Sequence, residues 1–259
     1  NASTSTYKHG LNHLSDMTDE EVKEYYNLRP IDAREFARNL RKAASISFDD
    51  MVDDEQSNNV VGEEYPVHDH RKKMMPVRNQ GNCGSCWAFA TQAVLEGSWQ
   101  AWQTQLEDHF STQVSVDCDT NNNGCNGGWY TGSFGYFKEK TIVYEKAYAY
   151  KAAKGTCEYK EGMDGDTGVK ITGFKSYLKD NGGQKSVFLE MMKRGPVATA
   201  VDANSEWFRY KSGVFTGKCG SGINHAVVIC GYGVTEGDKC GGKPQKFFII
   251  RNSWGASWG

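Results

Sequence analysis

The segment from Gln80 to Phe89, Gln-Gly-Asn-Cys-Gly-Ser-Cys-Trp-Ala-Phe, limits what this chain can be more than any other feature. It places Cys86 where a helix is predicted to begin, and the amide side chain of Gln80 lies six residues before that cysteine. A helix N-terminus lowers the pKa of a thiol, because it offers partial positive charge and unpaired N–H groups. Since the thiolate is the nucleophilic form of cysteine, the segment predicts a reactive thiol at Cys86.

Composition argues against several classes of function. A formal net charge of -2 gives no basic excess for a nucleic-acid partner or a membrane surface. The longest apolar runs, such as 226–230 and 247–250, are far shorter than the ~20 residues that span a bilayer. Eight cysteines in a chain that starts at Asn1 without an apolar leader indicate an oxidising compartment and a signal peptide removed or left out. Reactive or metal-bound cysteines are the competing explanation.

Residues 1 to about 62 differ from the rest of the chain. They contain no cysteine and carry twelve acidic against seven basic residues, a net charge of -5. Thr18-Asp-Glu-Glu21 is a capping box that predicts a short helix, and Pro30 suits the first turn of a second helix with one apolar stripe. The stretch 49–64 holds seven acids and no Lys or Arg, which predicts an exposed loop. This loop is either a solvated surface loop or a linker to be cut.

Beyond residue 80, predicted helices precede predicted strands. A long helix follows from Trp87, where small and apolar residues keep the i, i+3, i+4, i+7 spacing. Another runs from Gln184 to Arg194 and is closed by Gly-Pro. This segregation predicts an α+β chain of two lobes with a substrate cleft between them. The predicted strands are 169–174, 197–201, 226–232 and 247–251.

A nucleophilic thiol needs a base, and the base needs a group that orients it. His225, one of six histidines, precedes a predicted strand and lies 139 residues after Cys86. Asn252 ends the next predicted strand and can accept the imidazole N–H, while Trp254 can shield that bond from water. Gln80 and the backbone N–H of Cys86 are candidates for an oxyanion hole. Each residue alone also fits ordinary polar packing, but the set favours a catalytic site.

Successive blocks of the sequence resemble papain-family cysteine proteases, and cathepsin L in particular. Cys83-Gly-Ser-Cys86-Trp87 fits the family signature C-G-[SA]-C-[WY], and the separation of His225 from Cys86 lies within the family's range of about 130–150 residues. The segment 10–16, Gly-Leu-Asn-His-Leu-Ser-Asp, resembles the Gly-x-Asn-x-Phe-x-Asp motif of the family's propeptides. The other blocks, in the family's order, are 77–81, 125–128, 145–150, 195–197, 210–215, 224–226 and 252–255.

The resemblance implies a papain-like two-lobe α+β fold, with a helical lobe, an antiparallel β-barrel-like lobe and a partly helical propeptide before them. It implies an inhibitory propeptide and acidic linker over residues 1–62. The helical lobe with the nucleophile would cover 63–165, and the β lobe with the histidine and asparagine would cover 166–259. The mature enzyme would begin near residues 62 to 65.

Family members continue beyond the position of Gly259, so the β lobe is expected to lack its last strands. Cys219 would then lack its usual disulfide partner. Cys240 is a local substitute to consider, and Cys230, within a predicted strand, is expected to be a buried thiol.

Roles are carried over by the resemblance. Cys86 is the nucleophile, His225 the general acid and base, Asn252 the orienting residue and Gln80 the oxyanion donor. Small residues at two pocket positions predict a bulky apolar preference at the second residue before the cleaved bond. The implied substrate-binding residues are Gly127, Gly128, Trp129, Tyr130, Ala200, Ala226 and Trp254.

The resemblance also implies two disulfides, Cys83 with Cys125 and Cys118 with Cys157. Such bridges would clamp the helical lobe. Only His109 lies between Cys86 and Cys157, so the paired-histidine occluding loop of cathepsin B is missing, which favours an endopeptidase.

The sequence thus predicts a secreted or lysosomal cysteine endopeptidase zymogen that hydrolyses protein or peptide substrates through a thioester acyl-enzyme. It is expected to be a monomer, to be inhibited by its own propeptide, to be activated by acid, and to need no cofactor or metal. No nucleic-acid partner and no membrane span are expected. Two alternatives stay open: a non-catalytic binding protein on the same fold, and a zinc or dithiol module, since Cys83 and Cys86 also form a C-x-x-C pair.

Overall fold

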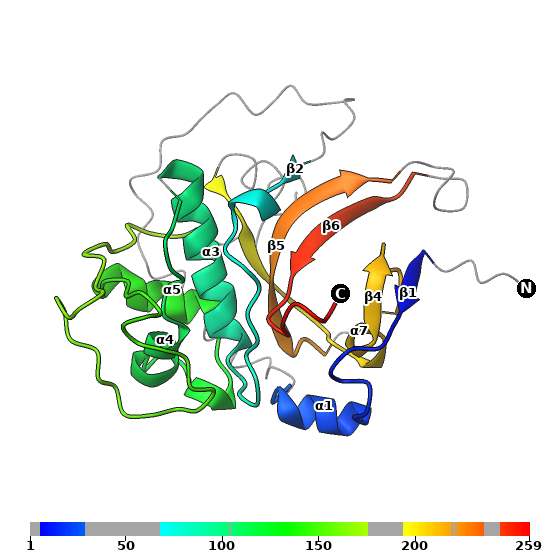
Figure 1. The fold of residues 1–259 in the computed structure, drawn as a ribbon, viewed down its shortest axis with the longest axis horizontal. Helices are drawn as coiled ribbons and strands as arrows, with labels where there is room; N and C mark the ends of the chain where they lie inside the picture. Colours follow the sequence, from blue (N-terminus) through cyan, green and yellow to red (C-terminus); the bar gives the residue numbers. More distant parts are fainter. Residues whose placement is uncertain are drawn as a thin grey trace, which may run out of the picture.

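The computed structural model describes residues 6–28, 68–103, 105–175, 194–218, 220, 222–235 and 244–259. Among these residues, helices gather on one side of the molecule and an antiparallel sheet on the other (Figure 1). This arrangement confirms the predicted α+β fold. The helical side contains α3 (Cys86–Trp102), α4 (Thr112–Cys118) and α5 (Tyr130–Glu139), and the sheet contains β2 (His68–Asp69), β3 (Val197–Val201), β5 (His225–Val234) and β6 (Lys246–Arg251).

The long helix predicted after residue 80 is α3, and it joins the two sides. Its small residues Ala90 and Ala93 pack against Ala226 of β5, so that the helix axis lies close to the sheet. Gly97 is needed on the same helix, because a Cβ there would lie 2.8 Å from the ring carbon Cδ of Pro196. The small residues that made this helix predictable are therefore also the ones that let β5 approach it.

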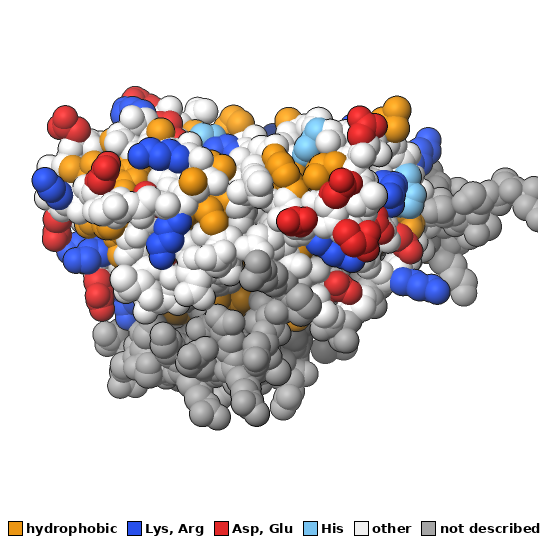
Figure 2. All heavy atoms as spheres, turned by 90° about the horizontal axis from the view of Figure 1, so that it is seen from below, with side chains coloured by type: hydrophobic (Ala, Val, Ile, Leu, Met, Phe, Trp, Pro, Cys, Tyr) orange, Lys and Arg blue, Asp and Glu red, His pale blue; other side chains and the backbone are white. Residues whose placement is uncertain are grey.

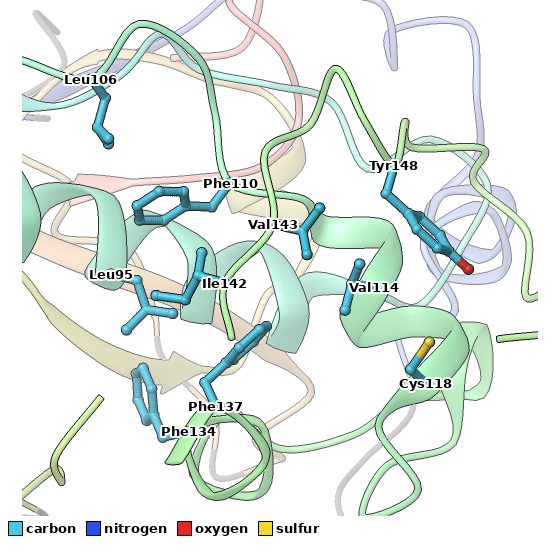
Figure 3. Packing of buried hydrophobic residues seen from close by; sticks show 10 residues of the cluster. All are labelled: Leu95, Leu106, Phe110, Val114, Cys118, Phe134, Phe137, Ile142, Val143 and Tyr148. Carbon is cyan, nitrogen blue, oxygen red and sulfur yellow. The ribbon is translucent and has the colours of Figure 1, made fainter. Parts of the chain in front are cut away.

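The main hydrophobic core lies between α3, α4, α5 and the loop that follows α5 (Figure 3). Phe110 and Phe137 are almost fully buried in it. Burying a side chain of this size stabilises the fold by about 1.5–3 kcal/mol. The ten members are Leu95, Leu106, Phe110, Val114, Cys118, Phe134, Phe137, Ile142, Val143 and Tyr148.

Strand β5 is the centre of the sheet, and all but its last residue are buried. β3 and β6 pair with it in antiparallel register, which sets Ala200 opposite Ala226 and Val201 opposite His225. The short strand β2 pairs with the far end of β5, at residues 231–232. The described strands form an open sheet, so the barrel-like closure expected for this lobe is not seen among these residues.

One predicted strand is wrong, and two predicted helices cannot be compared. Residues 169–174 form no strand, because their backbone hydrogen bonds go singly to a helix and a loop: Ile171 N–H donates to Phe137 O in α5, and Val169 O accepts the N–H of Ile142 in the loop after α5. The helix predicted from Pro30 lies outside the described residues, as does all but the last residue of the helix predicted over 184–194. None of the described helices is long and apolar enough to cross a bilayer.

The predicted capping box is present at α1 (Asp19–Tyr25). The hydroxyl of Thr18 accepts the N–H of Glu21 at 3.2 Å, and the Glu21 carboxylate accepts the N–H of Thr18 at 2.7 Å. Both bonds satisfy backbone donors that the helix itself leaves unpaired. In Figure 2, acidic side chains gather on the face where α1 lies.

The N-terminal segment 6–28 docks on the sheet side. Its strand β1 (Tyr7–His9) pairs with β4 (Tyr210–Gly213), and α1 lies near α7 (Ser205–Phe208). Asp19 and Arg209 form an ion pair at 3.3 Å across this contact. The segment thus shares a hydrophobic cluster with the sheet side, formed by Leu14, Val22, Tyr26, Leu28, Ala203, Phe208 and Trp254.

Candidate active site

Cys86 is the first residue of α3, as predicted, but its thiol is not acidified in this structure. Backbone N–H groups of Ala226, Trp87 and Cys86 itself favour the thiolate, whereas burial of the sulfur acts against it. Burial has the larger effect, so the pKa of Cys86 is raised. The expected effect of the helix terminus is thus present but is outweighed by burial.

His225 begins β5, the position predicted for it. Its Nε2 lies 2.7 Å from Oδ1 of Asn252, and its Nδ1 has no hydrogen-bond partner among the described residues. Burial lowers the pKa of His225 to about 4, and the bond to Asn252 acts in the opposite direction. Ala226 directly follows His225 and belongs to the same hydrophobic cluster as Cys86. The thiol and the imidazole therefore lie in the same part of the structure.

Strand pairing explains how Asn252 reaches His225. β6 ends at Arg251, which pairs with Val228 of β5, so the next residue of the chain emerges beside the start of β5. The Asn252 Oδ1 also accepts the N–H of Ser253 at 2.8 Å, which fixes the amide. Trp254 stacks on the His225 ring with centroids 4.8 Å apart, in the shielding position predicted from the sequence.

Gln80 is fully buried and held from both ends of its amide. Nε2 donates to the carbonyl oxygen of Cys83 at 2.9 Å, and Oε1 accepts the hydroxyl of Ser253 at 2.6 Å. Its backbone N–H also donates to Ser253 O at 2.8 Å. Gln80 therefore ties the loop before the nucleophile to the residue that follows Asn252.

Sequence reasoning missed the charged residues behind this site. Arg78, Glu96 and Arg251 line a cavity that also reaches Asn252 and Ser253. The Arg251 guanidinium donates to the carbonyl oxygens of residues 75 and 76 at 2.6 and 2.7 Å, which anchors the segment leading to Gln80. The sequence does contain one signal for Arg251: it is a charged residue at the end of a predicted strand that otherwise reads Phe-Phe-Ile-Ile.

The predicted pocket residues come together in part. Ala200 lies opposite Ala226 in the sheet, and Ala226 shares a hydrophobic cluster with Cys86 and Tyr130. Trp129 stacks on Tyr130, with ring centroids 4.7 Å apart.

The two glycines predicted to meet the substrate backbone lie just after Cys125. Gly127 has a φ of 103°, and a Cβ built on it would meet no atom of the described residues within 4 Å. At Gly128, by contrast, a Cβ would collide with Asn122. The open edge is therefore at Gly127, whereas Gly128 is required by internal packing. Trp254 lies apart from this group, on the His225 ring.

Both disulfides implied by the resemblance are present, Cys83–Cys125 and Cys118–Cys157. Because Cys83 is bonded to Cys125, it forms no dithiol pair with Cys86, which removes the basis for the zinc or dithiol alternative. Among the described residues, no three or more His, Cys, Asp or Glu side chains are grouped to hold a metal ion.

The remaining cysteines differ in how far they can be described. Cys230 is a buried free thiol, as expected, and burial raises its pKa to about 11. Cys219 and Cys240 lie outside the described residues.

The N-terminal segment lies against residues that flank the site. Tyr26 stacks on Trp254 at 4.8 Å, on the indole that also stacks on His225. The Asn27 amide donates to Cys125 O at 2.7 Å, beside the loop that carries the nucleophile. The segment therefore contacts both sides of the catalytic region.

Comparison with known proteins agrees with this geometry. A family model described as "Papain family cysteine protease" matches residues 63–259. Ananain from Ananas comosus is 34% identical over 261 residues, which cover 100% of this chain and 68% of ananain. A cathepsin L-like proteinase from Fasciola hepatica is also 34% identical, over 98% of this chain and 72% of that protein.

Solved structures extend the likeness to the fold. Digestive procathepsin L 3 from the larval midgut of Tenebrio molitor superposes with a TM-score of 0.76 at 29% identity, covering 98% of this chain and 75% of that one. A recombinant stem bromelain precursor gives a TM-score of 0.73 at 32% identity, covering 98% and 74%. Because the family model matches most of the chain and these relatives align over nearly all of it, the chain belongs to the papain family of cysteine proteases and is a papain-like cysteine endopeptidase.

Proposed function

We propose that Cys86 forms a thioester acyl-enzyme during peptide hydrolysis, with His225 as general acid and base. The observation that carries this proposal is the buried His225, whose Nε2 is held by Asn252 at 2.7 Å while Nδ1 is left for the thiol. An imidazole oriented through one nitrogen presents the other in a fixed direction. Cys86, at the N-terminus of α3, is the proposed nucleophile, because it shares a hydrophobic cluster with Ala226, the residue after His225.

Hydrolysis proceeds in two steps, acylation of Cys86 and then deacylation. The Cys86 thiolate attacks the carbonyl carbon, and the C–N bond breaks as the His225 imidazolium gives its proton to the leaving amine. Water then attacks the thioester while His225 takes one of its protons. The C–S bond breaks, and the thiolate and imidazolium are restored.

The thioester is tested by trapping it. Enzyme freed of its N-terminal region is mixed with a peptide ester and quenched in acid within milliseconds, and the digest is examined by mass spectrometry. We expect the acyl group on the peptide that contains Cys86. Turnover without any acyl adduct, or an adduct on another residue, would overturn the proposal.

We propose that the second residue before the cleaved bond is bulky and apolar. The support is the small pair Ala200 and Ala226, which lie opposite each other beside Tyr130 and Trp129. One methylene group in an apolar pocket changes kcat/KM by about 10–200-fold. A peptide panel should therefore favour Leu or Phe over Ala at this position, and equal rates across the panel would contradict the proposal.

Gln80 is proposed as an oxyanion donor. An amide nitrogen carries two N–H groups, and one of those on Gln80 is used by Cys83 O at 2.9 Å. The second, with the backbone N–H of Cys86, is the candidate donor to the developing oxyanion. Replacing Gln80 with alanine is expected to lower kcat by about 10²–10³-fold, with little change in KM.

Ser253→Ala is the matched control for Gln80→Ala, because Ser253 holds the Gln80 amide without being a proposed donor. Steady-state kinetics of both variants should give a much smaller loss for Ser253→Ala. A loss in Gln80→Ala that appears only in KM would contradict the assignment.

We infer the following division of the chain. Residues 1–62 are an inhibitory propeptide with its acidic linker, 63–165 the helical lobe and 166–259 the β lobe. The support is that the match to the family model begins at residue 63 and that the segment 6–28 contacts Trp254 and Cys125 beside the catalytic residues. N-terminal sequencing of the processed protein tests the first boundary, and a new N-terminus far from residues 62–65 would move it.

Acid is expected to weaken the folded chain. His225 has a pKa of about 4 in this structure against 6.5 in an exposed histidine, so between these values the unfolded chain binds a proton that the folded chain does not. The stability of the folded chain therefore falls as pH drops through this window, by about 3 kcal/mol at most. Self-activation should accordingly be faster at pH 4.5 than at pH 7, and an equal rate would exclude acid activation.

The contribution of His225 is isolated in a Cys86→Ser background, which prevents self-cleavage. Urea unfolding at pH 7 and pH 4.5 gives the loss of stability on acidification. We expect this loss to be smaller when His225 is also replaced by glutamine, which cannot be protonated. An identical loss in both proteins would show that other groups carry the pH dependence.

We further propose a secreted or lysosomal protease that acts as a monomer. Two disulfides support an oxidising compartment. Finding Cys83 and Cys125 reduced in protein isolated from its source would contradict the oxidising compartment. A mass by light scattering well above 28.9 kDa would contradict the monomer.

A further inference from the structure

Two histidines outside the catalytic region face each other at the edge strand β2. His68 lies in β2, and His70 follows the strand by one residue. Their Nε2 atoms share a hydrogen bond of 2.7 Å, and the rings meet edge to face with centroids 4.3 Å apart. The pair is far from His225, because β2 pairs with β5 at residues 231–232, whereas His225 is the first residue of β5.

The surrounding structure holds both rings in place. His70 is buried, and its backbone N–H donates to Cys230 O at 2.9 Å. The His68 ring stacks on Tyr232 with centroids 5.8 Å apart. Orientation by packing is what makes a ligand pair ready to bind, because little side-chain freedom is then lost on binding.

Two nearby polar side chains have other hydrogen-bond partners. Both carboxylate oxygens of Asp69 accept hydrogen bonds from the Arg71 guanidinium, at distances of 2.6 to 3.0 Å. The Cys230 thiol donates to Ile249 O at 3.4 Å. The nitrogen atoms that meet here are the Nε2 atoms of His68 and His70.

We infer that His68 and His70 form a two-imidazole site for a divalent transition-metal ion. The metal ion would replace the proton of the hydrogen bond between the two rings. Metal–nitrogen bonds of about 2.0–2.1 Å at a right angle place two nitrogens about 2.9 Å apart, only a few tenths of an ångström more than the 2.7 Å of this hydrogen bond. Tetrahedral coordination at the same bond lengths would need the two nitrogens to be about 3.4 Å apart. The geometry thus favours Ni²⁺ or Cu²⁺ over Zn²⁺, with water completing the shell.

The inference is tested by titrating the untagged chain with Ni²⁺ in a calorimeter at pH 7.5. The Cys86→Ser background removes the catalytic thiol as a competing ligand. We expect one Ni²⁺ per chain. His68→Gln and His70→Gln should each weaken binding by about tenfold or more, and the double variant should abolish it. His9→Gln is the matched control, since His9 is an exposed histidine on β1, and it should change the affinity less than twofold.

Electron paramagnetic resonance of the Cu²⁺-loaded chain supplies an independent readout. We expect coupling to two nitrogens, lost in the double variant. Because His70 is buried, each variant is checked for cooperative thermal unfolding. If His70→Gln does not fold, the inference is tested with His68→Gln alone, since His68 is partly exposed. Absence of Ni²⁺ binding below about 1 mM, or an affinity unchanged in folded His68→Gln, overturns the inference.

Discussion

Replacing Cys86 with serine is expected to lower kcat/KM for peptide hydrolysis by about 10⁴- to 10⁶-fold, the range seen when a catalytic nucleophile is removed. Serine keeps the shape of the side chain, but its hydroxyl does not ionise at the pH where a thiol does. The backbone N–H groups of Ala226 and Trp87, which favour a thiolate, then have no anion to stabilise. Progress curves of purified, processed enzyme measure the loss.

The fold should not change in this variant, because Cys86 is free of disulfide bonds and begins α3 without a side-chain cap. Thermal unfolding within about 1 kcal/mol of the parent serves as the control. Cys230→Ser is the matched thiol variant: it removes the other free cysteine of the described chain and should retain peptide hydrolysis. Residual activity above about a tenth in Cys86→Ser would assign the reaction to another nucleophile.

Replacing His225 with alanine is expected to lower kcat by about 10²–10⁴-fold, the usual contribution of general acid and base catalysis. The loss should exceed that of Asn252→Ala, since Asn252 acts only through its 2.7 Å bond to the ring. Asn252→Ala leaves the base in place but frees its orientation. Single-turnover acylation rates of the two variants give the comparison.

The pH profile separates the two roles. In His225→Ala the limb of the kcat/KM profile that reports imidazole ionisation should vanish, whereas in Asn252→Ala it should remain at a shifted pH. Equal losses with an unchanged profile in both variants would contradict the assignment of His225 as the base. Stability must be checked in both, since His225 and Asn252 are buried.

Local signals in the sequence were sufficient for some elements. The capping box at Thr18 depends on residues three apart, so it is visible without tertiary information, and α1 begins where it indicates. The same holds for α3, whose small residues repeat with helical spacing. Cys86 and Asn252 could be located because their positions relative to a helix start and a strand end are also local.

Other features depend on contacts between distant parts of the chain. Residues 169–174 have strand-like composition, but their hydrogen-bond partners are Phe137 in α5 and Ile142 in the loop after it, and pairing of this kind is set by the fold. The raised pKa of Cys86 has the same origin, because the helix terminus is local and burial is not. The pairing of Arg251 with carbonyl groups of residues 75 and 76 spans most of the chain and could not be inferred.

The aromatic rings stacked on Trp254 make its fluorescence a reporter of whether the N-terminal segment is in place. The indole is buried, and the rings of Tyr26 and His225 both stack on it. Departure of the N-terminal segment would replace the tyrosine ring with water, and indole emission moves to longer wavelength in a polar environment. Subtracting the spectrum of Trp254→Phe isolates this one fluorophore among the seven tryptophans. Opening of the site can then be timed separately from cleavage of the chain.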